Sequence, residues 1–110
     1  MFQVTISSLA EADIEQAFQW WAENRSISQA KQWYRSIFKA IDTLRSMPER
    51  CPLAVESFEI KNPIHQLLFG LGRGRATHRI LFRFSGDSVV ILRVLHVALG
   101  DLPIDMGFGG

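Results

Sequence analysis

The chain has 110 residues, enough for one domain with a single hydrophobic core and too few for two independent cores. Hydrophobic residues make up 47% and charged residues 21%, a composition that excludes an intrinsically disordered chain. The formal net charge of +1 says little about partners, but nine of the twelve basic residues are arginine.

The single cysteine, Cys51, cannot form an internal disulfide, so nothing indicates an oxidising compartment. The N-terminus has neither the basic segment nor the apolar segment of a secretion signal. No apolar run approaches the ~18 residues that a helix needs to span a bilayer. We therefore expect a cytoplasmic protein that does not interact with membranes.

The N-terminal residues predict a short strand and a helix. Residues 2–6 alternate in polarity, as a strand does. Residues 8–23 follow with a capping box, in which Ser8 and Glu11 satisfy free amides of the first turn. One apolar face then recurs at helical spacing, at Ile14, Ala17, Phe18 and Trp21.

A second helix follows after a polar break of about four residues. Its start is capped by Ser26 together with Gln29, or by Ser28 alone. Because a residue before proline disfavours helix, the helix should stop at Met47, ahead of Pro48. Two amphipathic helices with so short a connection predict an antiparallel helical hairpin.

The second half of the chain predicts a loop and three strands. Residues 48–63 contain three prolines and predict an ordered loop, with a short extended piece at residues 54–58. Apolar-rich runs at residues 64–71, 77–84 and 88–95 predict an antiparallel meander. The turns fall at glycines 70, 72 and 74, which we interpret as a hairpin turn and not a phosphate cradle, and at residues 85–87.

These elements predict an α+β domain, in the order strand, helix, helix, strand, strand, strand. The helical hairpin should pack on one face of a small antiparallel sheet. We expect residues 1–101 to form this single domain. Residues 102–110, with Pro103 and three glycines, should form a mobile tail or become ordered on a partner.

Arginines concentrate in the predicted sheet. The stretch from His65 to His96 has a net charge of +4, from five arginines opposed by Asp87. The guanidinium group binds phosphate through two parallel hydrogen bonds, so the cluster indicates a phosphate-bearing partner. A simply solubilising surface is the alternative, and Arg93 could instead pair with an acid of the helical hairpin. The five arginines are Arg73, Arg75, Arg79, Arg83 and Arg93.

Strand alternation predicts which side chains share a face. Arg79 and Arg83 should lie on the exposed face, opposite a core face that begins with His78. Arg93 and His96 should lie on opposite faces of the last strand, unless a bulge intervenes. The histidines are too scattered to predict a metal site. Of the adjacent Trp20 and Trp21, one should be exposed to a partner.

Three segments resemble the RelE/ParE superfamily of bacterial type II toxins: "WYRSIFKAIDTLRSMPERCP", "HRILFRFSGD" and "VVILRVLH". The likeness extends over residues 2–101. It implies a small toxin that a cognate antitoxin wraps and inhibits in a hetero-oligomer. RelE-like members cleave mRNA on the ribosome without a metal or cofactor, whereas ParE-like members poison DNA gyrase.

For the RelE-like activity, the resemblance implies that Arg79 and His96 are catalytic. Arg73, Arg75, Arg83 and Arg93 would bind the RNA, and Glu49 or Glu56 would be the base that activates its 2′-hydroxyl. We expect this ribosome-dependent endonuclease first. Gyrase inhibition through the helical hairpin and C-terminal tail, or a degenerate member without toxicity, is the alternative. It is favoured by the presence of only three lysines and no tyrosine near the C-terminus.

Overall fold

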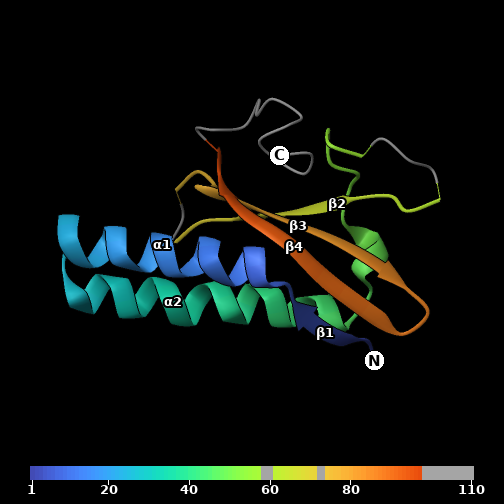
Figure 1. Ribbon diagram of the computed structural model, residues 1–110, viewed down its shortest axis with the longest axis horizontal. Coiled ribbons are helices and arrows are strands. Elements are labelled where there is room, and N and C mark those ends of the chain that lie inside the picture. The colour runs from blue at the N-terminus through green and yellow to red at the C-terminus, as the bar shows by residue number, and fades with distance from the viewer. Residues whose placement is uncertain (58–60, 72–73, 98–110) are drawn as a thin grey trace.

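A computed structural model describes residues 1–57, 61–71 and 74–97 of the chain. The predicted order of elements is confirmed, and the helical hairpin covers one face of the sheet (Figure 1). Residues 102–110, the predicted tail, lie outside the described residues. The elements are β1 (Gln3–Ile6), α1 (Ser8–Asn24), α2 (Ile27–Asp42), the short 3-10 helices η1 (Thr43–Arg45) and η2 (Pro48–Arg50), β2 (His65–Phe69), β3 (His78–Ser85) and β4 (Ser88–His96).

The sheet is mixed, whereas the sequence predicted an antiparallel one. Its strand order is β1-β4-β3-β2, and β2, β3 and β4 form the predicted antiparallel meander. The difference is β1, which pairs with β4 in parallel. Alternating polarity marks a strand but carries no information about the direction of its neighbour, so this pairing was not visible in the sequence.

Serine side chains start both helices. The Ser7 hydroxyl accepts a hydrogen bond from the Ala10 amide at 3.1 Å, so the cap of α1 is Ser7 and not the predicted Ser8. The Ser26 hydroxyl caps α2 in the same way, by accepting from the Gln29 amide at 3.0 Å. α2 ends at Asp42, earlier than predicted, because the chain tightens into η1 before it reaches Pro48.

Glycines are needed at two places in the meander. At Gly70, which follows β2, an added Cβ would lie 2.7 Å from the backbone oxygen of Arg75. Gly86, between β3 and β4, has a φ of 59° that other residues adopt only at a cost. The glycine-rich segment therefore joins two antiparallel strands, as predicted for a hairpin turn.

The main hydrophobic core lies between the helical hairpin and the sheet. Trp33 of α2 is fully buried and packs against Phe69 of β2 and His78 of β3. The other buried residues of this core are Ala10, Ile14, Ile37, Ile41, Leu44, Cys51, Ile80, Phe82, Val89, Ile91 and Val94. One packed unit thus joins both helices to the sheet.

A second, smaller apolar cluster lies on the opposite face of the sheet. It contains Leu81 and Leu95 of the sheet together with Ala54 and Ile64 of the loop. The face predicted to be exposed is therefore partly covered by the loop that follows η2. This correction matters for Arg79, which neighbours Leu81 on that face.

None of the helices in the described part of the chain is long and apolar enough to cross a membrane.

Candidate functional site

Arg79 is buried, contrary to its predicted place on an exposed face. Only 7% of the residue is accessible to solvent. Its Nη1 donates to Glu56 Oε1 and to Gln66 Oε1, each at 3.1 Å, and its Nη2 donates to Glu56 Oε2. Both oxygens of one carboxylate thus occupy the guanidinium fork.

Glu56 reaches Arg79 from the loop that covers the sheet. Burial alone would raise the pKa of Glu56, but the hydrogen bonds and charge of Arg79 outweigh it and lower the pKa. A carboxylate with a lowered pKa is a weak base, which makes Glu56 poorly suited to the proton abstraction considered for it. The other candidate base, Glu49, lies exposed in η2.

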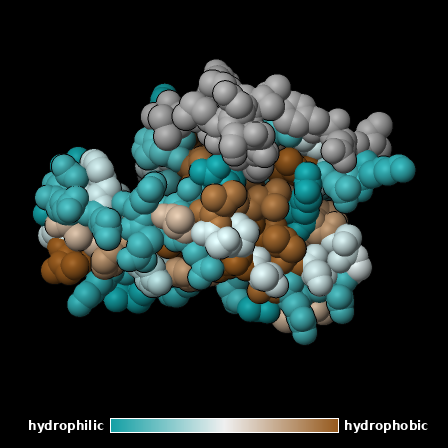
Figure 2. Space-filling view, in the orientation of Figure 1, coloured by the Kyte–Doolittle hydropathy of each residue, from teal (hydrophilic) through white to brown (hydrophobic). Residues whose placement is uncertain are grey.

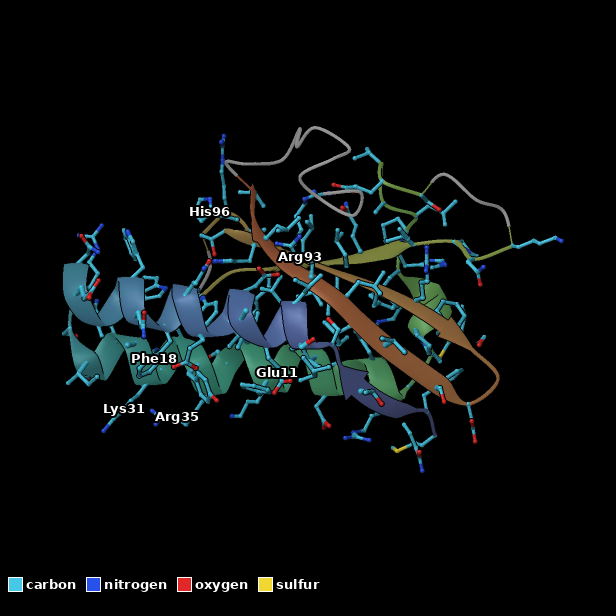
Figure 3. The ribbon with its side chains drawn as sticks, viewed as in Figure 1. Glu11, Phe18, Lys31, Arg35, Arg93 and His96 are labelled. Atoms are coloured by element: carbon cyan, nitrogen blue, oxygen red, sulfur yellow. The ribbon has the colours of Figure 1, made fainter. Side chains whose placement is uncertain are left out.

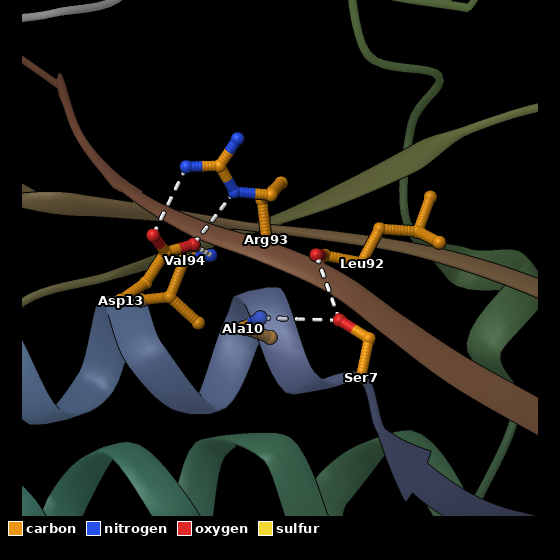
Figure 4. A network of polar contacts seen from close by, with 6 residues as sticks. All are labelled: Ser7, Ala10, Asp13, Leu92, Arg93 and Val94. Atoms are coloured by element: carbon orange, nitrogen blue, oxygen red, sulfur yellow. Dashed lines mark hydrogen bonds and ion pairs between the residues drawn. The ribbon is translucent and has the colours of Figure 1, made fainter. Parts of the chain in front are cut away.

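Arg93 forms an ion pair with an acid of the helical hairpin, the alternative considered for it from the sequence (Figure 4). Its Nε and Nη2 donate to Asp13 Oδ2 and Oδ1, at 2.8 and 3.0 Å. These hydrogen bonds raise the pKa of Arg93, against the opposing effect of burial. Arg93 is therefore a fixed link between β4 and α1.

A β-bulge lies next to Arg93, where the start of α1 runs along β4. The register of β3 against β4 shifts at this point, so that Leu92 is an extra residue of β4. The Ser7 hydroxyl donates to the Leu92 carbonyl at 3.0 Å, and the Val94 amide donates to Asp13 Oδ2 at 2.9 Å (Figure 4). The first turns of α1 thus satisfy backbone groups at the bulge, where the regular ladder is interrupted.

The remaining arginines of the predicted cluster are dispersed. Arg83 donates from Nε to the Asn62 carbonyl at 3.1 Å, and Arg75 is exposed near the start of β3. Arg73 lies outside the described residues. Of the four arginines that the structure describes here, two are thus bound to carboxylates and one to a backbone carbonyl. Their predicted roles in RNA binding and catalysis stay predictions.

His96 lies beside a second histidine at the end of the sheet. It is the cross-strand partner of His78, and their ring centroids are 5.1 Å apart. Arg79 is instead opposite Leu95. His78 is buried, with Thr77 Oγ1 2.8 Å from its Nδ1. Burial, and to a smaller extent the charge of His96, lowers the pKa of His78 to about 4, so this imidazole is neutral near pH 7.

The two histidines lie at one end of a groove between α1 and the ends of β3 and β4. Its volume is about 600 Å³. Trp20 is 49% exposed, which confirms that one of the adjacent tryptophans faces outward. The Arg25 guanidinium lies 5.8 Å from the centroid of the Trp20 ring. The lining residues are Asp13, Gln16, Ala17, Trp20, Trp21, Arg25, Thr77, His78, Arg93, Val94, Leu95 and His96.

This groove was not predicted as a unit. Sequence reasoning selected Arg93 and His96 and noticed the tryptophans, but it did not bring α1 next to the end of β4. His78 was assigned to the core face and missed as a member of the site. The position of His78 at the start of a strand could have indicated that it belongs to the site, because elements meet at strand ends. Within residues 1–57, 61–71 and 74–97, no group of three or more His, Cys, Asp or Glu side chains is placed to hold a metal ion.

Comparisons with known proteins identify the family. A solved structure described as the chromosomal ParDE TA system from P. aeruginosa has the same fold, with a TM-score of 0.68 and 18% sequence identity. The match covers 87% of this chain and 96% of that one. No match is found among curated proteins. The family model described as the ParE toxin of the type II toxin–antitoxin system parDE matches residues 4–98. The chain therefore belongs to the ParE toxin family of type II toxin–antitoxin systems.

Proposed function

We propose that this toxin arrests growth by binding DNA gyrase, that it does not cleave RNA, and that a cognate antitoxin neutralises it in a hetero-oligomer. The observation that carries this choice is the state of Arg79. The arginine that would stabilise charge on the reacting phosphate instead holds Glu56 inside the protein.

Phosphate binding by Arg79 would require this ion pair to break. Separating one partner of a buried pair costs about 3–5 kcal/mol, because a charge is left uncompensated. The released Glu56 would also repel the phosphate. A cation that stabilises a transition state must be in place before the reaction, and Arg79 does not meet this requirement.

The surface of the sheet supports binding to protein partners. Leu68 of β2 and Val90 of β4 are 54% and 37% exposed. On the face seen in Figure 2, hydrophobic side chains gather over the sheet, whereas the helical hairpin is mostly covered by hydrophilic ones. Exposed apolar patches of this kind are typical of protein interaction sites.

Two assays of the purified protein test the proposal. We expect it to inhibit DNA supercoiling by gyrase and to leave mRNA on translating ribosomes intact. Arg79→Lys, which keeps the charge but loses the two-pronged fork, should still inhibit gyrase at equal concentrations of folded protein. Cleavage of ribosome-bound mRNA without gyrase inhibition would refute the proposal.

Ribosome-dependent mRNA cleavage is the second candidate, and the histidine pair favours it. Two adjacent imidazoles beside a groove that also contains Arg93 provide groups for metal-independent proton transfer. Under this alternative, the cleavage assay would give products, and His96→Gln would abolish them without unfolding the protein. Unimpaired growth after induced expression would instead indicate a member without toxicity.

A further inference from the structure

We propose that the groove between α1 and the ends of β3 and β4 is the surface that contacts the target, where it receives an apolar side chain from an acidic segment of gyrase. This inference rests on the proposed function and names the part of the toxin that performs it.

The walls of the groove suit an apolar anchor. Trp20 and Trp21 lie with ring centroids 5.6 Å apart at 89°, and Val94 and Leu95 of β4 are among the other residues that line the groove. A volume of about 600 Å³ provides room for a large side chain and its neighbours. Tryptophan and arginine are the residue types that most often dominate binding energy at protein interfaces. The half-exposed Trp20 beside Arg25 is such a pair.

The charge of the groove favours an acidic partner. Among its lining residues, Asp13 is the sole carboxylate, and it is neutralised by Arg93. Arg25 is exposed and forms no ion pair with any residue that the structure describes. A carboxylate arriving with the apolar side chain would gain a charge-assisted hydrogen bond from Arg25, which complements the groove electrostatically.

The groove is held in shape by contacts already described. Asp13 binds both the Arg93 guanidinium and the Val94 amide, so α1 and β4 are fixed relative to one another along the wall of the groove. A rigid site loses little conformational freedom when a partner enters, and this favours affinity.

Cations on the other side of the hairpin provide a matched control. Lys31 and Arg35 of α2 are exposed and lie on the opposite side of the hairpin from His96 (Figure 3). Neither residue lines the groove. Reversing the charge of either residue changes the net charge as much as the same change at Arg25.

The experiment measures supercoiling inhibition and direct binding to purified gyrase subunits for each variant. We expect Trp20→Ala and Arg25→Glu to raise the concentration for half-inhibition at least about tenfold, as for interface hot spots. Lys31→Glu and Arg35→Glu should stay within about twofold of the unmodified toxin, as residues outside the contact do. Circular dichroism and thermal unfolding verify that each variant is folded.

The possible results separate the two proposals. If the unmodified toxin does not inhibit gyrase, both fail. If it inhibits and Trp20→Ala and Arg25→Glu inhibit equally well, the groove proposal alone fails. An equal loss in Lys31→Glu would also overturn it, because general charge would then explain the effect. It fails as well if the groove variants lose only binding of antitoxin or of a single-stranded RNA oligonucleotide.

Discussion

Arg79 has a side chain that could bind a phosphate, but in this fold it forms a buried structural ion pair. The Arg79 and Glu56 side chains retain 8% and 10% of their accessible surface. A guanidinium group binds a carboxylate through the same two parallel hydrogen bonds that it forms with a phosphate. In this protein the carboxylate comes from the loop that follows η2. The contribution of this pair to folding is therefore testable separately from toxicity.

We predict that Glu56→Ala destabilises the protein by about 3–5 kcal/mol, because Arg79 then stays buried without its main counter-charge. Glu56→Gln should cost less, since the amide oxygen still accepts a hydrogen bond from the guanidinium. Urea unfolding followed by circular dichroism measures both changes. The double variant Glu56→Leu with Arg79→Met is the control and should be more stable than Glu56→Ala. Equal stability of Glu56→Ala and the unmodified protein would contradict the prediction.

His78 should make folding sensitive to pH. Its pKa is lowered to about 4 by burial and by His96, whereas an unfolded chain has the ordinary value of about 6.5. The unfolded state then binds the proton more readily, so stability falls as the pH drops from about 6.5 towards 4. We expect the loss from this group to reach about 3 kcal/mol at pH 4.

The variant His78→Leu isolates this effect, because its buried side chain cannot titrate. Urea unfolding between pH 7.5 and pH 4 should show a shallower loss of stability in the variant. The lowered pKa of Glu56 acts in the same direction, but its window begins lower, below the ordinary carboxyl pKa of about 4.3. Parallel curves for the two proteins would contradict the role given to His78.

At the scale of elements, sequence patterns over neighbouring residues predicted the helices and strands, because these depend mainly on contacts between residues close in the chain. The serine caps, the helical apolar faces and the alternating strands placed both helices and the meander to within a few residues. The bulge at Leu92 was left open, because the groups that bind its backbone and that of Val94 come from Ser7 and Asp13, which are 85 and 81 residues from their respective partners. The pairing of Arg79 with Glu56, 23 residues apart through a loop, was likewise invisible to strand periodicity. Contacts between distant segments therefore limited the prediction of the site more than that of the fold.

Docking of α1 on β4 should depend on two side chains of its first turns. Ser7→Ala removes both the helix cap and the bond to the Leu92 carbonyl, at a cost of about 1–2 kcal/mol. Asp13→Ala should cost more, because it leaves Arg93 without its carboxylate and the Val94 amide without its acceptor. Urea denaturation measures these changes, with exposed Glu15→Ala on the same helix as the control. A smaller loss for Asp13→Ala than for Ser7→Ala would contradict this ranking.

At the scale of the whole molecule, one core joins every layer, while the two sides of the sheet differ in their surfaces. The hairpin side carries the groove with its tryptophans and histidines, and the opposite face carries the small cluster under the loop. The two apolar clusters and the ion pairs stabilise the fold. The contacts of this small toxin with its partners therefore involve the side chains that remain exposed. Stability and target binding should accordingly respond to different residues.

Trp33 tests whether the domain unfolds as a single unit. It is fully buried and contacts β2 and β3 from α2, so Trp33→Ala should cost about 3–5 kcal/mol, a large share of the stability of a domain this size. Trp33→Phe should cost less, because the indole nitrogen has no hydrogen-bond partner among the described residues and its removal leaves no polar group unpaired. Thermal unfolding, followed by far- and near-ultraviolet circular dichroism, should give one coincident transition that shifts to lower temperature in both variants. Helical signal that persists after tertiary signal is lost would show instead that the hairpin is stable without the sheet.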